Sequence, residues 1–123
     1  MDSTIRKITL IPRHTSFVGA RTFTTKPISV REFASANITM WGGCMFGTLP
    51  NLEIRVQTSQ DLQAWTEIQL FSGFGVGSGV EVTHDAVFND EWMRLSIALT
   101  GTGEPVAVCW AVGEFLPRVA AAA

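Results

Sequence analysis

The feature that most constrains the fold of this chain is a pair of alternating segments in its middle. Residues 52–58 alternate apolar and polar side chains, residues 59–63 are mostly polar, and residues 64–70 alternate again. A period of two places the apolar side chains on one face of a strand, and two such strands around a short polar segment are typical of an antiparallel pair. The sequence therefore predicts a β-hairpin over residues 52–70.

The rest of the chain continues this pattern, without a convincing helical segment. Further strands are predicted at 5–11, 17–25, 28–33, 37–41, 44–46, 80–83, 92–100 and 106–116. Gly42 and Gly43 predict a bulge or turn, and residues 101–105 predict a turn between the last two strands. Roughly seven to nine short strands with regular turn signals predict an all-β fold, an antiparallel β-sandwich of the jelly-roll or Greek-key type.

The last predicted strand is apolar on both faces. One face carries Val106, Val108, Trp110 and Val112, and the other carries Ala107, Cys109, Ala111 and Gly113. A strand of this kind lies either in the centre of a sandwich or against a neighbouring subunit.

Length and composition indicate one domain with a weakly charged surface. The chain has 123 residues, of which 46% are hydrophobic and 16% charged, and its net charge is −2. We expect a single domain over residues 1–123, with an N-terminal arm over about residues 1–13 and a tail over 117–123. Few charges favour a homo-oligomer or a larger assembly, and the slightly acidic balance argues against nucleic acid as a partner.

The N-terminus and the hydropathy pattern predict where the protein is made. Residues 1–4 are polar and no long apolar core follows them, so we expect no signal peptide. No run is long enough to span a bilayer, so we expect no membrane partner. Synthesis in the cytoplasm would leave Cys44 and Cys109 reduced by default. Whether the two cysteines pair depends on a distance that the sequence does not give.

No group of residues predicts catalysis, a metal or a cofactor. His84 and Asp85 form the only neighbouring histidine–acid pair, and His14 is remote from them in sequence. A catalytic triad also needs a nucleophile, and nothing selects a serine for that role. The acidic residues at 85–91 lack the spacing of a calcium loop. We therefore expect a protein that is not an enzyme and that uses no cofactor and no metal.

A glycine-rich segment over residues 73–79 predicts a flexible connection. A phosphate-binding loop would open a helix and carry a lysine, and this segment precedes a short strand without one. Its apolar residues Phe74 and Val76 are candidates for contact with a neighbouring molecule. Together with the N-terminal arm up to Arg13, they form the interface that the sequence predicts.

The four tryptophans are the candidates for ligand binding. An exposed indole ring on a β-sandwich can stack against the apolar face of a sugar. Trp65 and Trp110 alternate with apolar neighbours, which predicts that they lie in the core. Trp41 and Trp92 are the remaining candidates for a ligand platform.

Two segments resemble a known group of domains. The run Glu53–Asp61, followed by Trp65 and Thr66, resembles a recurrent hairpin of discoidin-like and related jelly-roll domains, in which Ser59 and Asp61 can cap the turn. The segment Trp92–Gly101 resembles the closing strands of the same group. The combination, over residues 52–116, is similar to small β-sandwich proteins of tailed-bacteriophage virions.

This resemblance implies a structural role. The first hypothesis is a virion component without enzymatic activity, such as a capsid-decorating (cement) protein or a head or tail accessory protein. Its partners would be capsid or tail proteins and further copies of the chain, and its location would be the virion. The alternative hypothesis is a carbohydrate-binding β-sandwich module that uses Trp41 or Trp92.

Overall fold

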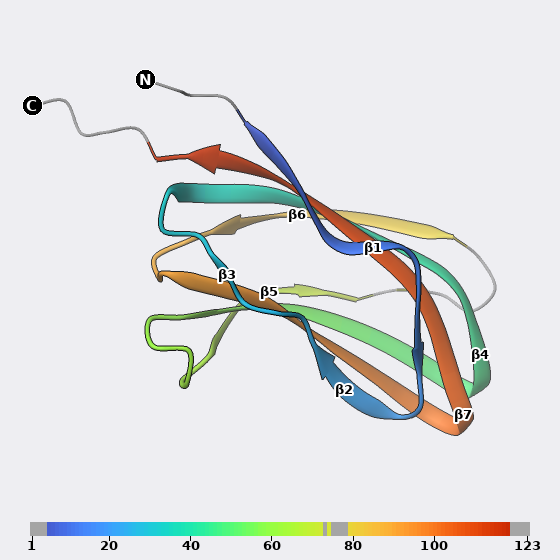
Figure 1. Ribbon diagram of the computed structural model, residues 1–123. Coiled ribbons are helices and arrows are strands. Elements are labelled where there is room, and N and C mark those ends of the chain that lie inside the picture. Colours follow the sequence, from blue (N-terminus) through green and yellow to red (C-terminus); the bar gives the residue numbers. More distant parts are fainter. Residues whose placement is uncertain (1–4, 73, 75–78, 119–123) are drawn as a thin grey trace, which may run out of the picture.

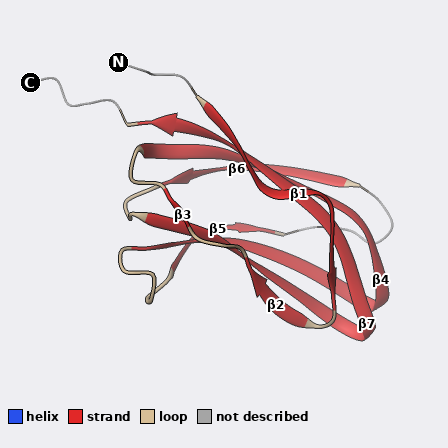
Figure 2. Ribbon diagram, viewed as in Figure 1, coloured by secondary structure: helices blue, strands red, loops and turns tan. Residues whose placement is uncertain are grey.

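The computed structural model describes residues 5–72, 74 and 79–118. Every regular element in these residues is a β-strand, as Figure 2 shows, and they contain no helix that could span a membrane. The strands are β1 (Arg6–Val18), β2 (Arg21–Thr24), β3 (Ile28–Ser29), β4 (Phe33–Ser59), β5 (Thr66–Phe71), β6 (Val80–Val87) and β7 (Trp92–Pro117). The prediction of an all-β, antiparallel fold is confirmed.

Two long strands form the frame of the sandwich. β4 has 27 residues and β7 has 26, and they pair antiparallel from Phe33 opposite Pro117 to Ser59 opposite Trp92. Both strands turn over together near their middle, at the right of Figure 1, so that each contributes to two layers. One layer has the order β6-β4-β7-β1, and the other places β5 beside β4 and both β2 and β3 beside β7.

The bend between the layers replaces the turn that the sequence predicts at residues 101–105. The chain continues there as one strand, so the two predicted C-terminal strands are halves of β7 in different layers. Gly47, Gly101 and Gly103 have φ angles of 118°, 133° and 71°, a region that favours glycine. These residues let the paired strands turn sharply without breaking, and this is why two of the strands are long where short strands were expected.

The hairpin predicted over residues 52–70 is present. β4 pairs with β5 from Ile54 opposite Phe71 to Thr58 opposite Thr66, with an irregularity after Val56. The second strand therefore begins two residues later than the alternation suggests. The register places Phe71 on the inner face opposite Ile54, whereas Leu70 lies on the outer face opposite Arg55, so the alternation of the second strand did not give its inner face.

Side chains at Ser59 and Asp61 fix the hairpin turn. The Ser59 hydroxyl accepts a hydrogen bond from the amide of Leu62 at 2.9 Å, and Asp61 Oδ1 accepts from the amides of Gln63 and Ala64 at 2.9 and 3.0 Å. The amides of Ala64 and Gln63 and the Ser59 hydroxyl lower the pKa of the Asp61 carboxyl. The charged form stabilises the turn, so this contribution is lost as the pH falls through the lowered pKa.

The N-terminal segment belongs to the sheet. β1 pairs with β7 from Arg6 opposite Phe115 onward, so the expected arm at residues 1–13 is a strand from Arg6 onward. The pairing is irregular between Ile11, opposite Ala111, and Thr15, opposite Cys109. Three residues of β1 therefore face the single residue Trp110, and the strand bulges outward at Pro12, Arg13 and His14.

The core lies between the layers. The inner face of β7 carries Met93, Leu95, Ile97, Leu99, Ala107, Cys109 and Ala111, all of them buried. Phe115 is fully buried, and its ring centroid lies 5.2 Å from that of Phe33 and 5.8 Å from that of Phe88. These three rings close the end of the sandwich away from the bend.

The two cysteines are free and differ in exposure. Cys44 is exposed at the irregular part of β4, and Cys109 is buried on the inner face of β7. Burial raises the pKa of the Cys109 thiol to about 12. This thiol is therefore neutral at physiological pH and acts as a small apolar side chain.

Candidate functional site

The outer face of the layer β6-β4-β7-β1 carries an ordered set of side chains. Residues directly opposite each other in an antiparallel pair project to the same face. Trp41 of β4 lies opposite Trp110 of β7 on one side and Glu81 of β6 on the other. The bulge of β1 adds Arg13 beside Trp110. We call Arg13, Trp110, Trp41 and Glu81, which cross four adjacent strands, the tryptophan row.

The two indole rings of the row stack on each other. Their centroids are 6.4 Å apart and their planes meet at 29°, and both residues are half-buried. Gly43 and Gly79 lie directly against Trp41, since a Cβ atom would come within 2.9 Å of the ring at Gly43 and within 3.1 Å at Gly79. These glycines give the ring room to rest against the backbone, and contacts of this kind restrict its rotamers.

Arg13 lies over the second ring. Its guanidinium carbon is 5.0 Å from the centroid of the Trp110 ring, within the range of a cation–π contact. Arg13, His14, Trp41 and Trp110 line a surface depression of about 290 Å³. A neighbouring depression of about 330 Å³ shares Arg13 and Trp110 with it. The remaining residues that line this neighbour are Lys7, Thr39, Glu81, Val112 and Glu114.

Polar side chains follow the tryptophan row along the same face. The hydroxyls of Thr39 and Thr83 are 3.0 Å apart, and the Asn37 amide donates a hydrogen bond to Asp85 at 2.8 Å. Flat apolar rings next to hydroxyl, amide and carboxylate groups provide the contacts that a sugar needs, since its ring has apolar faces and a polar edge. The face therefore offers an apolar stacking surface beside hydrogen-bonding groups.

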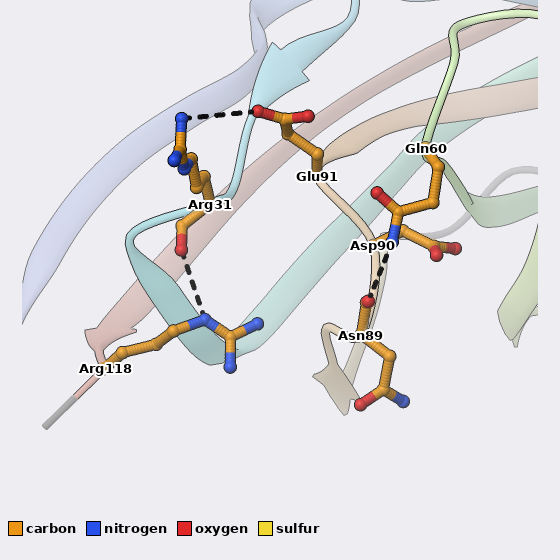
Figure 3. A pocket seen from close by; sticks show the side chains of 6 residues that line it. All are labelled: Arg31, Gln60, Asn89, Asp90, Glu91 and Arg118. Carbon is orange, nitrogen blue, oxygen red and sulfur yellow. Dashed lines mark hydrogen bonds and ion pairs between the residues drawn. The ribbon is translucent and has the colours of Figure 1, made fainter. Parts of the chain in front are cut away.

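A third, larger depression of about 430 Å³ is lined by polar and charged residues. Figure 3 shows its six lining residues, Arg31, Gln60, Asn89, Asp90, Glu91 and Arg118. Most of their polar groups bind the protein itself. Arg118 donates to the carbonyl oxygens of Arg31 at 3.1 Å and Phe88 at 2.8 Å, and Asp90 accepts from the Thr58 hydroxyl at 2.8 Å. The hydrogen bonds of Arg118 connect the end of β7 to the turn before β4 and to Phe88, so we assign this cluster a structural role.

Metal binding has no candidate in the part of the chain that the structure describes. No group of three or more histidine, cysteine, aspartate or glutamate side chains lies close enough together there to hold an ion. His84 packs against the ring of Phe71 with centroids 4.9 Å apart.

The structure separates the two tryptophans that the sequence nominates as a platform. Trp41 lies in the tryptophan row, whereas Trp92 begins the other half of β7, opposite Ser59 and Ser29. The prediction that Trp65 and Trp110 lie in the core is wrong, because both are only half-buried and neither belongs to the cluster of buried residues. Arg94 lies 4.1 Å over the Trp65 ring. Alternation grouped Trp110 with the correct neighbours but could not tell which face of β7 is the outer one.

The residues predicted for the interface have different outcomes in the structure. Phe74 is 6% exposed and belongs to the core, where its ring lies against Gly42, so it is not an exposed contact residue as expected. Val76 lies outside the described residues. Arg13 is exposed, but its position over Trp110 makes it part of the same surface as Trp41. The alternation of β1 gave no signal for this, because the bulge that places Arg13 depends on pairing with β7.

Comparisons with known proteins support the fold. No protein-family model and no curated protein matches the sequence. Among solved structures, one described as "CBM4 structure and function" superposes with a TM-score of 0.50 at 14% identity and covers 79% of this chain. The chain spans 61% of the length of that protein. At this level of identity, the similarity establishes the β-sandwich fold alone.

A second structure is more distant. The CBM36-1 domain of a multidomain xylanase from the hindgut metagenome of Trinervitermes trinervoides aligns with a TM-score of 0.43 at 10% identity. The alignment covers 92% of this chain and 86% of that domain.

Proposed function

We propose that this chain is a carbohydrate-binding domain without enzymatic activity, and that the tryptophan row is its binding surface. The observation that carries the proposal is the stacked pair of half-buried rings, Trp41 and Trp110, on an outer sheet face. A partly exposed apolar ring, such as Trp41 with its close contacts to Gly43 and Gly79, is suited to receive another flat apolar face. Glu81 and Arg13 at the two ends of the row supply hydrogen-bonding groups for sugar hydroxyls.

Stacking and hydrogen bonding make different contributions in this proposal. The two rings provide the buried apolar area, and the charged ends of the row set the orientation of the ligand. The chain as a whole would thus position a polysaccharide and leave its bonds intact.

The test is affinity electrophoresis of the whole chain in gels that contain soluble β-glucan, xylan, mannan, pectin or alginate. We expect at least one polysaccharide to retard the protein, and Trp110→Ala to weaken that binding about tenfold or more, equivalent to about 1.4 kcal/mol. Trp92→Ala is the matched control, because it removes an indole ring of similar exposure from the other half of β7. Absence of retardation in every gel, or equal losses in both variants, would contradict the proposal.

A second candidate function is the assembly role that the sequence predicts. The observation that favours it is the exposure of large apolar side chains at the bend, with Phe46 61% and Leu49 87% exposed. In this proposal, copies of the chain associate through the bend, and the resemblance to virion proteins remains a prediction about the setting in which they do so.

The measurement for this second candidate is the mass in solution, by light scattering after gel filtration over a series of concentrations. We expect an oligomer for the native chain and a monomer for the Phe46→Ser, Leu49→Ser double variant, because the substitutions remove the apolar contact area. A native chain that stays monomeric at the highest concentration would rule out self-assembly through this surface.

A further inference from the structure

We infer that the tryptophan row selects acidic sugars, with a carboxylate of the saccharide bound by Arg13. The inference rests on the proposed function and adds to it the chemical class of the ligand and the direction in which it lies. The row presents one cation and one carboxylate at opposite ends, and the cation lies at the end where the first depression is lined only by Arg13, His14 and the two rings.

Arg13 has a charge available for a ligand. The ion pairs among the described residues join Arg31 to Glu91 and Arg55 to Glu53 and Glu67, and none involves Arg13. Its guanidinium is held by the face of the Trp110 ring, which leaves its N–H groups free of a carboxylate. A guanidinium positioned in this way can donate two parallel hydrogen bonds to a carboxylate, the geometry in which arginine binds most strongly.

The bulge of β1 explains why this arginine is so placed. In a regular strand, one residue of β1 would face Trp110 and its neighbours would alternate between the two faces. Because three residues face Trp110 instead, the strand moves outward at Pro12, Arg13 and His14, and His14 takes a φ angle of 65°. Bulges commonly redirect a side chain toward a binding surface.

Glu81 and Glu114 line the neighbouring depression, which shares Arg13, but the residues that line the depression over the two rings include no carboxylate. Lys7 of β1 lies directly opposite Glu114 of β7 in the register, so a cation is next to that carboxylate. Asp85 accepts a hydrogen bond from Asn37 at the far side of the layer. Glu81 lies beyond Trp41, and four adjacent strands at the usual spacing separate the ends of the row by roughly 14 Å.

This arrangement gives the bound saccharide a direction. The chain of sugar rings crosses the strands, with its acidic unit at Arg13, neutral faces over Trp110 and Trp41, and hydroxyls that donate to Glu81. A neutral saccharide would keep the stacking and the Glu81 contacts but lose the charge-assisted bonds to Arg13.

The experiment compares acidic sugars with their own neutral forms. Oligogalacturonate and alginate oligomers are each tested before and after chemical reduction of their carboxyl groups, which keeps the linkage and removes the charge. Isothermal titration calorimetry on the whole chain should give at least about tenfold tighter binding of one acidic oligomer than of its reduced form, as expected for charge-assisted hydrogen bonds. Higher salt should weaken the binding of the acidic form more than that of the reduced form.

Variants of two arginines assign the effect to the site. Arg13→Gln should reduce the affinity for the acidic oligomer to that for its reduced form, and Arg13→Lys should restore part of it. Arg21→Gln is the matched control, because Arg21 also lies over an aromatic ring, with its guanidinium carbon 5.4 Å from the centroid of Phe23, but in the other layer. Thermal unfolding of all three variants checks that each is folded.

The outcomes separate this inference from the proposal on which it rests. Equal binding of an acidic oligomer and its reduced form, with loss of both in Trp110→Ala, overturns the inference and leaves the carbohydrate-binding role in place. Preference for the acidic form that survives in Arg13→Gln also overturns it. Failure of every acidic and neutral saccharide to bind overturns the inference and the proposed function together.

Discussion

Replacing Phe115 by alanine is expected to lower the free energy of unfolding by about 3–5 kcal/mol, a large share of the stability of a domain of this size. The ring is completely buried and contacts the rings of Phe33 and Phe88. It also covers the backbone of Gly113, where a Cβ atom would come within 2.4 Å of it. Its removal therefore leaves a cavity where strands from both halves of the chain meet. Urea denaturation, followed by tryptophan fluorescence, measures the change.

The adjacent residue provides the control for this prediction. Leu116 lies next to Phe115 on β7 but points to the outer face and is 43% exposed. We expect Leu116→Ala to change the free energy of unfolding by about 0.5 kcal/mol or less, as is usual for surface positions. Similar losses in the two variants would show that the inner and outer faces of β7 are assigned incorrectly.

Replacing Gly101 by alanine is expected to cost about 2–3 kcal/mol, the range for strained backbone at positions that favour glycine. The φ angle of Gly101 is 133°, and a Cβ atom there would lie 3.1 Å from the Cα atom of Pro50 and from the carbonyl oxygen of Thr48. Both contacts are with backbone atoms, which cannot move away by a change of rotamer as side-chain atoms can. Because the bend joins both layers, we expect a cooperative decrease of the melting temperature in differential scanning calorimetry.

Gly103, a second glycine of the bend, tests whether glycine is required there by close backbone packing or by a positive φ angle. Gly103 has a φ angle of 71° and no neighbouring atom closer than 3.7 Å to a Cβ position, so it has space for a side chain. Asparagine accepts this conformation better than most residues, and Gly103→Asn should cost no more than about 1 kcal/mol. If Gly103→Asn is as damaging as Gly101→Ala, close backbone packing is not what requires glycine at the bend.

These stability effects are separate from the proposed binding surface. Phe115 and Gly101 act on the core and on the bend, whereas Arg13 and Glu81 are exposed on an outer face. Substitutions of Arg13 and Glu81 should therefore change ligand affinity with little effect on folding. Binding and unfolding measurements on the same variants can test the function without interference from misfolding.

The sequence by itself determined the local features of this protein. Alternation identified the strands of the hairpin at residues 52–70 and grouped the side chains of β7 into the correct two faces. Ser59 and Asp61 were recognisable as turn residues because their side chains bond to amides two or three residues away. These features depend on neighbours within a few residues, so a period of two and the chemistry of short polar side chains suffice to predict them.

Only the tertiary structure decided which residues meet. The sequence predicted a turn at residues 101–105, but the facing glycines of β4 and β7 form a bend that carries both strands into two layers. Trp41 and Trp110 are far apart in the chain and become neighbours through the register of β4 with β7, and Arg13 joins them through a bulge against β7. Alternation cannot give register or show which face of a doubly apolar strand is outside, because both depend on long-range pairing and on what covers each face.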